Sequence, residues 1–292
     1  MTAIISVRDL EKTFGQVYAA RDITLDIDAG EVTGIIGANG AGKTTFVNMI
    51  TGHLPPSRGT ITFDGRDVTG LPSRTIARLG IARSFQVAQI FPSLTVEENV
   101  LSATALSNTP PNVVVQMLTP RAGRETVATA NEIIDRFRLS AYRDAPARQL
   151  PQGVRKILDI AMAVVSRPRV ILLDEPTSGI SIEEKYDLME VVVAALKASG
   201  ITILFVEHDM EIVARFADRV LAFYDGTVFA DGSPAKVLAD PDVQKLVTGT
   251  PHAAAAAVGA AGRVTPVDDD GPVETDRGAP FASPAAHGAS HA

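Results

Sequence analysis

Residues 37–45 read Gly-Ala-Asn-Gly-Ala-Gly-Lys-Thr-Thr and follow the pattern G-x-x-x-x-G-K-[ST]. The three glycines allow backbone torsions and a close approach to a ligand that a β-carbon would block. The N–H groups of the loop can then point inward around an anion, next to the positive end of the following helix. In this pattern the Lys43 side chain reaches the β- and γ-phosphates of a nucleotide, and the Thr44 hydroxyl is placed to bind Mg²⁺. The stretch therefore predicts a polyphosphate-binding loop rather than an incidental glycine-rich turn.

The segments on both sides of this loop support the same interpretation. Residues 32–36, Val-Thr-Gly-Ile-Ile, form an apolar run typical of a buried strand. Residues 46–50, Phe-Val-Asn-Met-Ile, continue as a helix that ends near Gly52. A strand, then the loop, then a helix is the order in which this motif binds phosphate groups.

The composition of the chain excludes several classes of protein. With 292 residues, of which 46% are hydrophobic and 21% charged, it falls in the ordinary range of soluble globular proteins. The absence of cysteine excludes disulfides, zinc–thiolate sites and thiol catalysis, and agrees with a cytosolic location. The net charge of −7 argues against a nucleic-acid-binding protein. No apolar run reaches the roughly 18 residues of a membrane span, and the first residues do not resemble a signal peptide. Any membrane role is therefore expected to depend on a partner.

The hydrophobic pattern divides the chain into regions. Up to residue 249 strand-like and helix-like segments alternate, which predicts an α/β protein. Within it, residues 91–166 are mostly helical and interrupt a phosphate-binding core of about residues 1–90 and 167–249. Residues 250–292 are rich in alanine, glycine and proline, and we expect this tail to be disordered because it has few large apolar side chains.

Local signals mark individual elements of the expected fold. Residues 23–27, 170–173 and 201–206 have strand patterns, and residues 220–230 predict a hairpin with a turn at Asp225-Gly226. Two helices are expected to begin with capping boxes, one formed by Thr95 and Glu98 and the other by Ser181 and Glu184.

A second stretch adds chemistry to the phosphate loop. Residues 170–176 read Val-Ile-Leu-Leu-Asp-Glu-Pro, an apolar strand that ends in two carboxylates. Asp174 would hold Mg²⁺ directly or through water. Glu175 would polarise the water that attacks the γ-phosphate, a contribution of roughly 10²–10⁴-fold in rate. The alternative is that both carboxylates only cap the next helix. His208 follows the strand of residues 201–206, at the edge where open α/β sheets bind ligands.

Taken in order, residues 37–45, Gln86, residues 150–154, residues 172–176 and His208 resemble the nucleotide-binding subunit of an ATP-binding cassette (ABC) transporter. The resemblance covers roughly residues 4–249. It implies an α/β fold: a P-loop NTPase core with a mostly parallel sheet, an N-terminal antiparallel β subdomain and an inserted helical subdomain. It also implies that ATP and Mg²⁺ are bound.

The resemblance further implies roles for individual residues. Phe14 would stack on adenine, Gln86 would contact Mg²⁺ and the attacking water, Glu175 would be the general base, and His208 would contact the γ-phosphate. Thr44, Gln86 and Asp174 would hold the metal. The ATP-binding residues implied in this way are Phe14, Gly37, Ala38, Asn39, Gly40, Ala41, Gly42, Lys43, Thr44, Thr45 and Gln86.

One motif departs from the family. The family signature Leu-Ser-Gly-Gly-Gln contacts ATP held by the opposite subunit, and here its counterpart is Leu150, Pro151, Gln152 and Gly153, followed by Val154. Pro151 replaces the serine, so a hydroxyl and a backbone N–H are lost.

Two interpretations of this departure stay open. Either the backbone still closes the shared site, or this chain works in a heterodimer whose other ATPase subunit supplies the intact signature. We favour the heterodimer over a homodimer. Ser181, where many members carry Asp, weakens communication across the dimer in the same way.

The resemblance extends to one branch of the family. Residues 80–86, 91–100, 207–211 and 232–243 resemble the ATPases of branched-chain amino acid importers. This branch implies a second ATPase subunit, integral membrane permease subunits and, indirectly, a periplasmic solute-binding protein. The chain would then be cytoplasmic and peripheral on the inner face of the plasma membrane.

Several alternatives remain. Importers of urea or other amides and the lipopolysaccharide-exporting ATPase share much of the pattern. An ABC ATPase of translation or DNA repair usually carries two cassettes or a long coiled coil, neither of which is seen in the sequence. A regulator that does not hydrolyse ATP is suggested only by Pro151 and is opposed by Glu175 and His208.

Overall fold

The computed structural model describes residues 3–84, 90–107 and 120–248. Gln86 and the tail from residue 250 therefore lie outside the described residues, and their expected properties stay predictions. No helix in these described ranges is long and apolar enough to cross a membrane.

A six-stranded sheet forms the centre of the fold, in the order β10-β9-β3-β8-β7-β6. All neighbours in it are parallel except β10 and β9, which form an antiparallel hairpin. The strands are β3 (Val32–Gly37), β6 (Ile81–Ser84), β7 (Val170–Asp174), β8 (Thr202–Val206), β9 (Arg219–Tyr224) and β10 (Thr227–Gly232). The expected strands at 170–173 and 201–206 and the hairpin at 220–230 are thereby confirmed.

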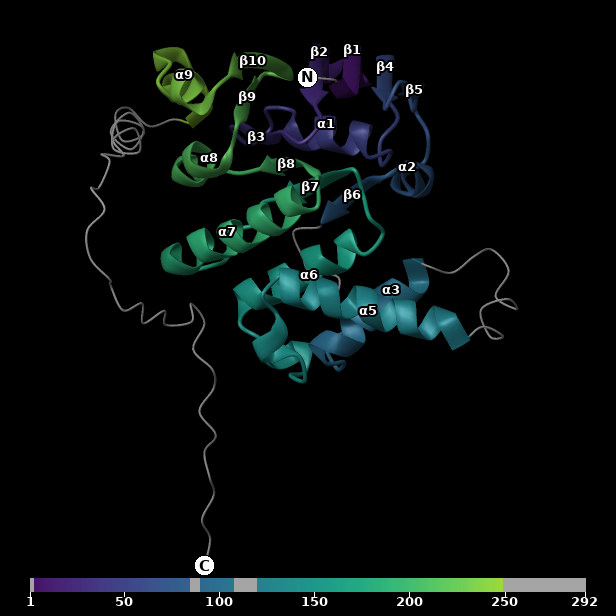
Figure 1. Cartoon of the computed structure of the whole chain (residues 1–292). Helices are drawn as coiled ribbons and strands as arrows, with labels where there is room; N and C mark the ends of the chain where they lie inside the picture. Colours follow the sequence, from purple (N-terminus) through teal and green to yellow (C-terminus); the bar gives the residue numbers. More distant parts are fainter. Residues whose placement is uncertain (1–2, 85–89, 108–119, 249–292) are drawn as a thin grey trace, which may run out of the picture.

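A second, antiparallel sheet comes mostly from the N-terminal part of the chain, in the order β2-β1-β4-β5. Its strands are β1 (Ala3–Phe14), β2 (Val17–Asp28), β4 (Arg58–Phe63) and β5 (Arg66–Asp67). Helix α1 (Lys43–Ile50) lies between the two sheets (Figure 1). Its Phe46 ring lies 5.3 Å from that of Phe223 on β9, measured between ring centroids. This layer is one of two hydrophobic cores among the described residues.

The other core lies on the opposite face of the six-stranded sheet. Strand β7 shows why its sequence is continuously apolar: Leu172 packs into the core around α1, whereas Ile171 and Leu173 pack into the opposite core. Successive side chains of a strand point to opposite faces, so a strand covered on both faces needs apolar residues throughout.

Helices cover this second face and extend away from it (Figure 1). The described part of residues 91–166 contributes helices and short 3-10 turns, which agrees with its predicted helical character. Helix α2 (Ser73–Leu79) instead packs into the core around α1 through Ile76. The other helices of the described residues are α3 (Val96–Ser107), α5 (Pro120–Arg136), α6 (Gln152–Val164), α7 (Ile182–Ala198), α8 (Met210–Phe216), α9 (Pro234–Leu238) and α10 (Pro241–Val243), with 3-10 turns at Ser140–Tyr142 and Ala147–Gln149 and a π-helical segment at Gln244–Thr248.

The two expected capping boxes differ in detail. At the start of α3 the Glu98 N–H donates to Thr95 Oγ1 at 3.1 Å, and the Thr95 N–H donates to Glu98 Oε2 at 2.8 Å, a complete box. At the start of α7 the Glu184 N–H donates to Ser181 Oγ at 3.4 Å, but the Glu184 carboxylate accepts from the Ser181 hydroxyl instead of the backbone. Ser181 therefore caps α7, and only half of the second box forms.

Candidate nucleotide site

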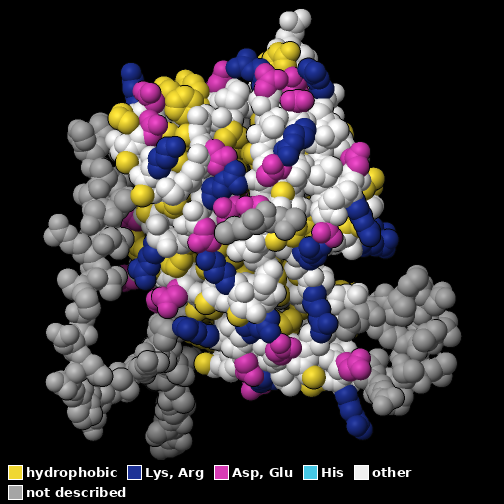
Figure 2. All heavy atoms as spheres, turned by 45° about the horizontal axis from the view of Figure 1, so that its top comes forward, with side chains coloured by type: hydrophobic (Ala, Val, Ile, Leu, Met, Phe, Trp, Pro, Cys, Tyr) yellow, Lys and Arg dark blue, Asp and Glu magenta, His cyan; other side chains and the backbone are white. Residues whose placement is uncertain are grey.

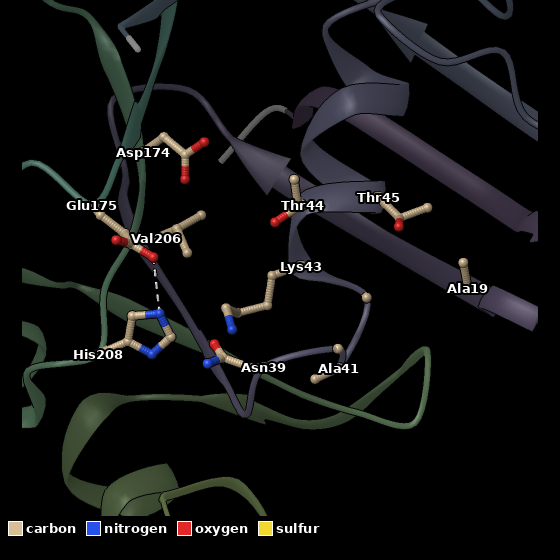
Figure 3. A pocket seen from close by; sticks show the side chains of 12 residues that line it. Ala19, Asn39, Ala41, Lys43, Thr44, Thr45, Asp174, Glu175, Val206 and His208 are labelled. Atoms are coloured by element: carbon tan, nitrogen blue, oxygen red, sulfur yellow. Dashed lines mark hydrogen bonds and ion pairs between the residues drawn. The ribbon is translucent and has the colours of Figure 1, made fainter. Parts of the chain in front are cut away.

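The candidate site lies where three neighbouring parallel strands end. Ile35 of β3 pairs with Val206 of β8, and Val206 pairs with Asp174 of β7. The loop after β3 therefore meets the acidic pair at the end of β7 and His208, which follows β8. A pocket forms there, and Figure 3 shows Asp174, Glu175 and His208 facing Lys43 and Thr44 across it. Its lining residues are Ala19, Asn39, Gly40, Ala41, Gly42, Lys43, Thr44, Thr45, Asp174, Glu175, Val206 and His208.

The phosphate loop needs glycine for two different contacts. A β-carbon on Gly37 would lie 2.7 Å from the carbonyl oxygen of Phe223. Gly42 adopts a left-handed backbone with φ 100°, and a β-carbon there would lie 2.7 Å from the carbonyl oxygen of Ala19. The loop is thus packed against β9 and β2, and any larger residue at these positions would push it away.

Lys43 is held inside this loop. Its ammonium donates hydrogen bonds to the carbonyl oxygens of Gly37 at 2.6 Å and Ala38 at 3.0 Å. Burial lowers the pKa of the Lys43 ammonium, while the carboxylates of Glu175 and Asp174 oppose that shift. The lysine can therefore exchange its two carbonyl partners for phosphate oxygens without moving to a new part of the molecule.

Arg83 of β6 holds the first carboxylate of the acidic pair. One guanidinium nitrogen donates to Asp174 Oδ2 at 2.6 Å, and the other donates to Asn48 Oδ1 of α1, also at 2.6 Å. The side chains of Arg83 and Asp174 are only 10% and 21% exposed, so little water screens the pair. The planar fork of an arginine suits two acceptors that lie side by side. Asp174 is thereby fixed relative to the helix that follows the phosphate loop.

Glu175 forms a direct pair with His208. The Nε2 of His208 lies 3.0 Å from Glu175 Oε1, and the two side chains are 46% and 28% exposed (Figure 3). If Nε2 carries the ring proton, it donates this hydrogen bond to the carboxylate. Glu175 also has a left-handed backbone, with φ 47°, which is uncommon for a residue with a β-carbon.

The oxygen donors of the pocket fit a magnesium ion that arrives with a nucleotide. The Thr44 hydroxyl and the Asp174 carboxylate both line the pocket, and hard oxygen ligands are those that Mg²⁺ prefers. No cluster of three or more His, Cys, Asp or Glu side chains suited to a metal is found among residues 3–84, 90–107 and 120–248. Gln86, a further predicted ligand, lies outside the described residues. Phosphate oxygens and water would complete the set, as is usual for Mg²⁺ in nucleotide sites.

Comparison with known proteins identifies the family. The model of the ABC transporter family matches residues 20–178, more than half of the chain. The chain belongs to the ABC transporter family. It is thus an ATPase cassette of the kind that binds nucleotide at such a loop.

Individual relatives match over most of their length. The high-affinity branched-chain amino acid transport ATP-binding protein BraF of Pseudomonas aeruginosa is 33% identical over 249 residues, which cover 84% of this chain and 98% of BraF. LivG of Escherichia coli K12, of the same description, is 34% identical over 249 residues, with coverage of 84% and 98%. The crystal structure of another ABC transporter cassette, in its ADP conformation, is 31% identical and superposes with a TM-score of 0.74, covering 84% of this chain and 98% of that one.

The remaining residues that the sequence suggested for this ABC cassette lie away from the pocket or outside the described part. Phe14 ends β1 with its side chain 55% exposed, and Lys12 Nζ lies 5.3 Å from its ring centroid. It is not among the lining residues of the pocket, so adenine stacking stays a prediction. Gln86 lies outside the described residues, and its role also stays a prediction.

The signature counterpart of this ABC cassette lies at the start of α6 and does not line the chain's own pocket. Pro151 occupies the N-cap position of that helix, and no side chain caps it there. A serine or threonine at this position would accept a hydrogen bond from the first turn.

Two residues of the site were missed by the sequence analysis. Arg83 stands in the stretch that resembles the family, but no role was assigned to it, and Asn48 appeared only as part of a helix. Their partners are 91 and 35 residues away along the chain. These contacts depend on how β6 lies beside β7 and α1 in the folded chain, so no local signal in the sequence could have found them.

The bridge from Arg83 to Asp174 predicts a measurable coupling. We expect Arg83→Met and Asp174→Asn each to lower the free energy of unfolding, and the double-mutant cycle to give a coupling of about 1–2 kcal/mol, since the pair is partly buried. Urea unfolding of the four proteins measures it. The matched control is the cycle of Arg215 with Glu190, an exposed pair at 3.8 Å, whose coupling should stay below about 0.5 kcal/mol. Additive effects at Arg83 and Asp174 would contradict the bridge.

Proposed function

We propose that this chain is the ATP-hydrolysing subunit of an ABC importer and that it couples ATP binding and hydrolysis at a dimer interface to amino-acid transport. The observation that carries the proposal is the convergence of Lys43, Thr44, Asp174, Glu175 and His208 on one pocket. Each supplies one of the functions that phosphoryl transfer to water requires: phosphate binding, metal binding, a general base and a γ-phosphate contact.

Hydrolysis would begin with an exchange of partners in the phosphate loop. The inward N–H groups of residues 37–45 would surround the β-phosphate, and the Lys43 ammonium would leave its two carbonyls for phosphate oxygens. Thr44 and Asp174 would hold Mg²⁺, which when bound neutralises charge on the phosphates. Arg83, which donates to Asp174 Oδ2, would hold this carboxylate in place for the ion.

Glu175 would then accept a proton from the water that attacks the γ-phosphate. In the structure its carboxylate is paired with His208 at 3.0 Å. This pair engages Oε1 of the carboxylate, and a γ-phosphate that accepts a hydrogen bond from His208 would leave Glu175 available to the water. General-base assistance of this kind is typically worth about 10²–10⁴-fold in rate.

The signature counterpart would act on a nucleotide held by a second subunit. It begins helix α6 and is not part of the chain's own pocket. Pro151 offers neither a hydroxyl nor an N–H to that nucleotide. Ser181, which caps α7, offers no carboxylate across the interface. We therefore favour a heterodimer in which this chain's complete pocket is closed by another ATPase subunit's signature.

The names of the relatives support a proposal for the solute, the partners and the location. BraF and LivG are named as ATP-binding proteins of branched-chain amino acid transport, and we propose the same solute class here. Permease subunits in the membrane would hold this subunit at the cytoplasmic face of the plasma membrane, and a periplasmic binding protein would deliver the solute. On the face shown in Figure 2, basic and acidic side chains are interspersed among the described residues, which does not favour nucleic acid as a partner.

The role of Glu175 is tested by Glu175→Gln. This change keeps the shape of the side chain but removes its basicity, so we expect ATP turnover to fall at least about 100-fold. The Kd for ATP should change less than about threefold, because Lys43 and the loop N–H groups remain. Glu183→Gln, in the exposed first turn of α7, is the control and should leave turnover unchanged. Full turnover by Glu175→Gln would show that another group accepts the proton.

The role of Pro151 is tested by Pro151→Ser. The serine restores a hydroxyl at the signature and can cap α6, so we expect about 1 kcal/mol more stability and a severalfold higher turnover of the chain assayed alone. Pro72→Ser is the matched control, since Pro72 is an uncapped N-cap of α2 with nearly the same backbone torsions. It should give the gain in stability without the gain in turnover. Equal turnover of the unchanged protein and Pro151→Ser would mean that Pro151 is tolerated.

A further inference from the structure

The backbone at Glu175 adopts an unfavourable conformation. Its φ of 47° lies in the left-handed region, which a residue with a β-carbon adopts only where its surroundings hold it there. Its N–H donates to the carbonyl of Val206 on β8 at 3.0 Å, which fixes one side of the residue. The direction of the Glu175 side chain depends on this torsion. A group that fixes the carbonyl of Glu175 therefore also aims its carboxylate.

Lys156 of α6 fixes the carbonyl of Glu175. Its ammonium lies 3.1 Å from the carbonyl oxygen of Glu175 and 2.8 Å from that of Ser178. The Ser178 N–H also donates to the Glu175 carbonyl, at 3.1 Å, which closes a turn over residues 175–178. Lys156 therefore donates to both ends of the segment that begins with the proposed general base.

A buried carboxylate holds the middle of the same segment. Glu207 is 3% exposed, and its Oε1 accepts from the Thr177 N–H at 2.9 Å and the Thr177 hydroxyl at 2.6 Å. Its Oε2 accepts from the N–H of His208 at 3.1 Å. The segment is thus held by a cation that binds its carbonyls and an anion that binds its donors, and the two opposite charges offset each other.

We infer that Lys156 is a positioning residue that, together with Glu207, sets the backbone of Glu175 and so aims its carboxylate. The inference rests on the proposed function, in which Glu175 is the general base. Lys156 is not among the residues that line the pocket. It acts through two carbonyl groups, and a displacement of a catalytic group by about 1 Å can cost about 10²-fold in rate.

The position of Lys156 gives this contact a second consequence. Lys156 lies one turn after Gln152, the first residue of α6 and part of the signature counterpart. Gln152 itself lies against the same loop, because a β-carbon on Gly179 would be 2.7 Å from Gln152 Nε2. The start of α6 therefore contacts residues 175–179 at two points, through hydrogen bonds at Lys156 and through close approach at Gln152.

The test replaces Lys156 and separates turnover from binding. Lys156→Met removes both donations, and we expect kcat to fall at least about tenfold with the KM and Kd for ATP changed less than about threefold. Lys156→Arg keeps the charge and the N–H donors, and we expect it to retain at least about a third of the kcat of the unchanged protein. Turnover is measured in the assembly that hydrolyses ATP fastest, either the chain alone or the chain with its second ATPase subunit. Lys197→Met, which breaks the half-exposed pair of Lys197 with Asp218, is the control and should leave kcat unchanged.

Hydrogen exchange of the chain alone gives a local readout. In Lys156→Met the peptide covering residues 175–181 should exchange faster, and peptides of the phosphate loop should not. If Lys156→Met does not fold, the variant Thr177→Val tests the inference in its place. It removes the hydroxyl bond to Glu207 with little change of shape, and a kcat at least about threefold lower at unchanged KM supports the inference.

Two results would overturn the inference. The first is a kcat of Lys156→Met within twofold of that of the unchanged protein, or the same result for Thr177→Val where Lys156→Met does not fold. The second is a loss of kcat in Lys156→Met that Lys156→Arg shows to the same extent. Glu175→Gln in the same assay distinguishes a failure of the positioning role of Lys156 from a failure of the general-base role of Glu175. If Glu175→Gln is inactive and Lys156→Met is fully active, only the positioning role is wrong. If Glu175→Gln is fully active, Glu175 is not the general base, and the positioning role fails with it.

Discussion

The parallel register of β3, β8 and β7 is the constraint on which the rest of the site depends. Because these neighbouring strands end at the same level, the phosphate loop, the acidic pair and His208 meet at one edge of the sheet. A slip of one residue in β7 would turn Asp174 to the opposite face and bury a carboxylate in a hydrophobic core. The two cores hold the register, since alternate residues of β7 pack into each of them.

The charges around this edge are held by directed hydrogen bonds. Arg83 spans Asn48 and Asp174, Lys156 binds two carbonyls, and Glu207 binds the donors of Thr177. Each buried charge would be costly without its partners, so each network specifies one arrangement. Lys43 differs, because in the proposed function it would exchange carbonyl oxygens for phosphate oxygens, and such an exchange of hydrogen bonds is close to balanced. The hydrogen-bond networks thus fix the positions of the acidic pair, whereas the partners of Lys43 in the phosphate loop can be exchanged.

The sequence predicts those parts of the fold that depend on local chemistry. The phosphate loop, the apolar strand before the acidic pair, the hairpin at Asp225-Gly226 and the cap at Thr95 are each encoded within a few residues, and the structure has all of them. The contacts of Arg83 and Lys156 could not be predicted in this way. Arg83 meets Asp174 across 91 residues, and Lys156 binds backbone carbonyls, which leave no mark in a sequence. The left-handed backbone of Glu175 is also invisible in a sequence, because glutamate does not favour it.

We propose that this chain carries a hydrolytic pocket that needs another subunit's signature. The most direct measurement is ATP turnover of a mixed dimer in which the second ATPase subunit lacks the lysine of its own phosphate loop. We expect this dimer still to hydrolyse ATP, at the pocket of this chain, and we expect the further change Lys43→Met to abolish the remaining turnover. Two results would contradict the need for a second subunit's signature. One is turnover by this chain alone that equals the turnover of the mixed dimer, and the other is a mixed dimer that does not hydrolyse ATP.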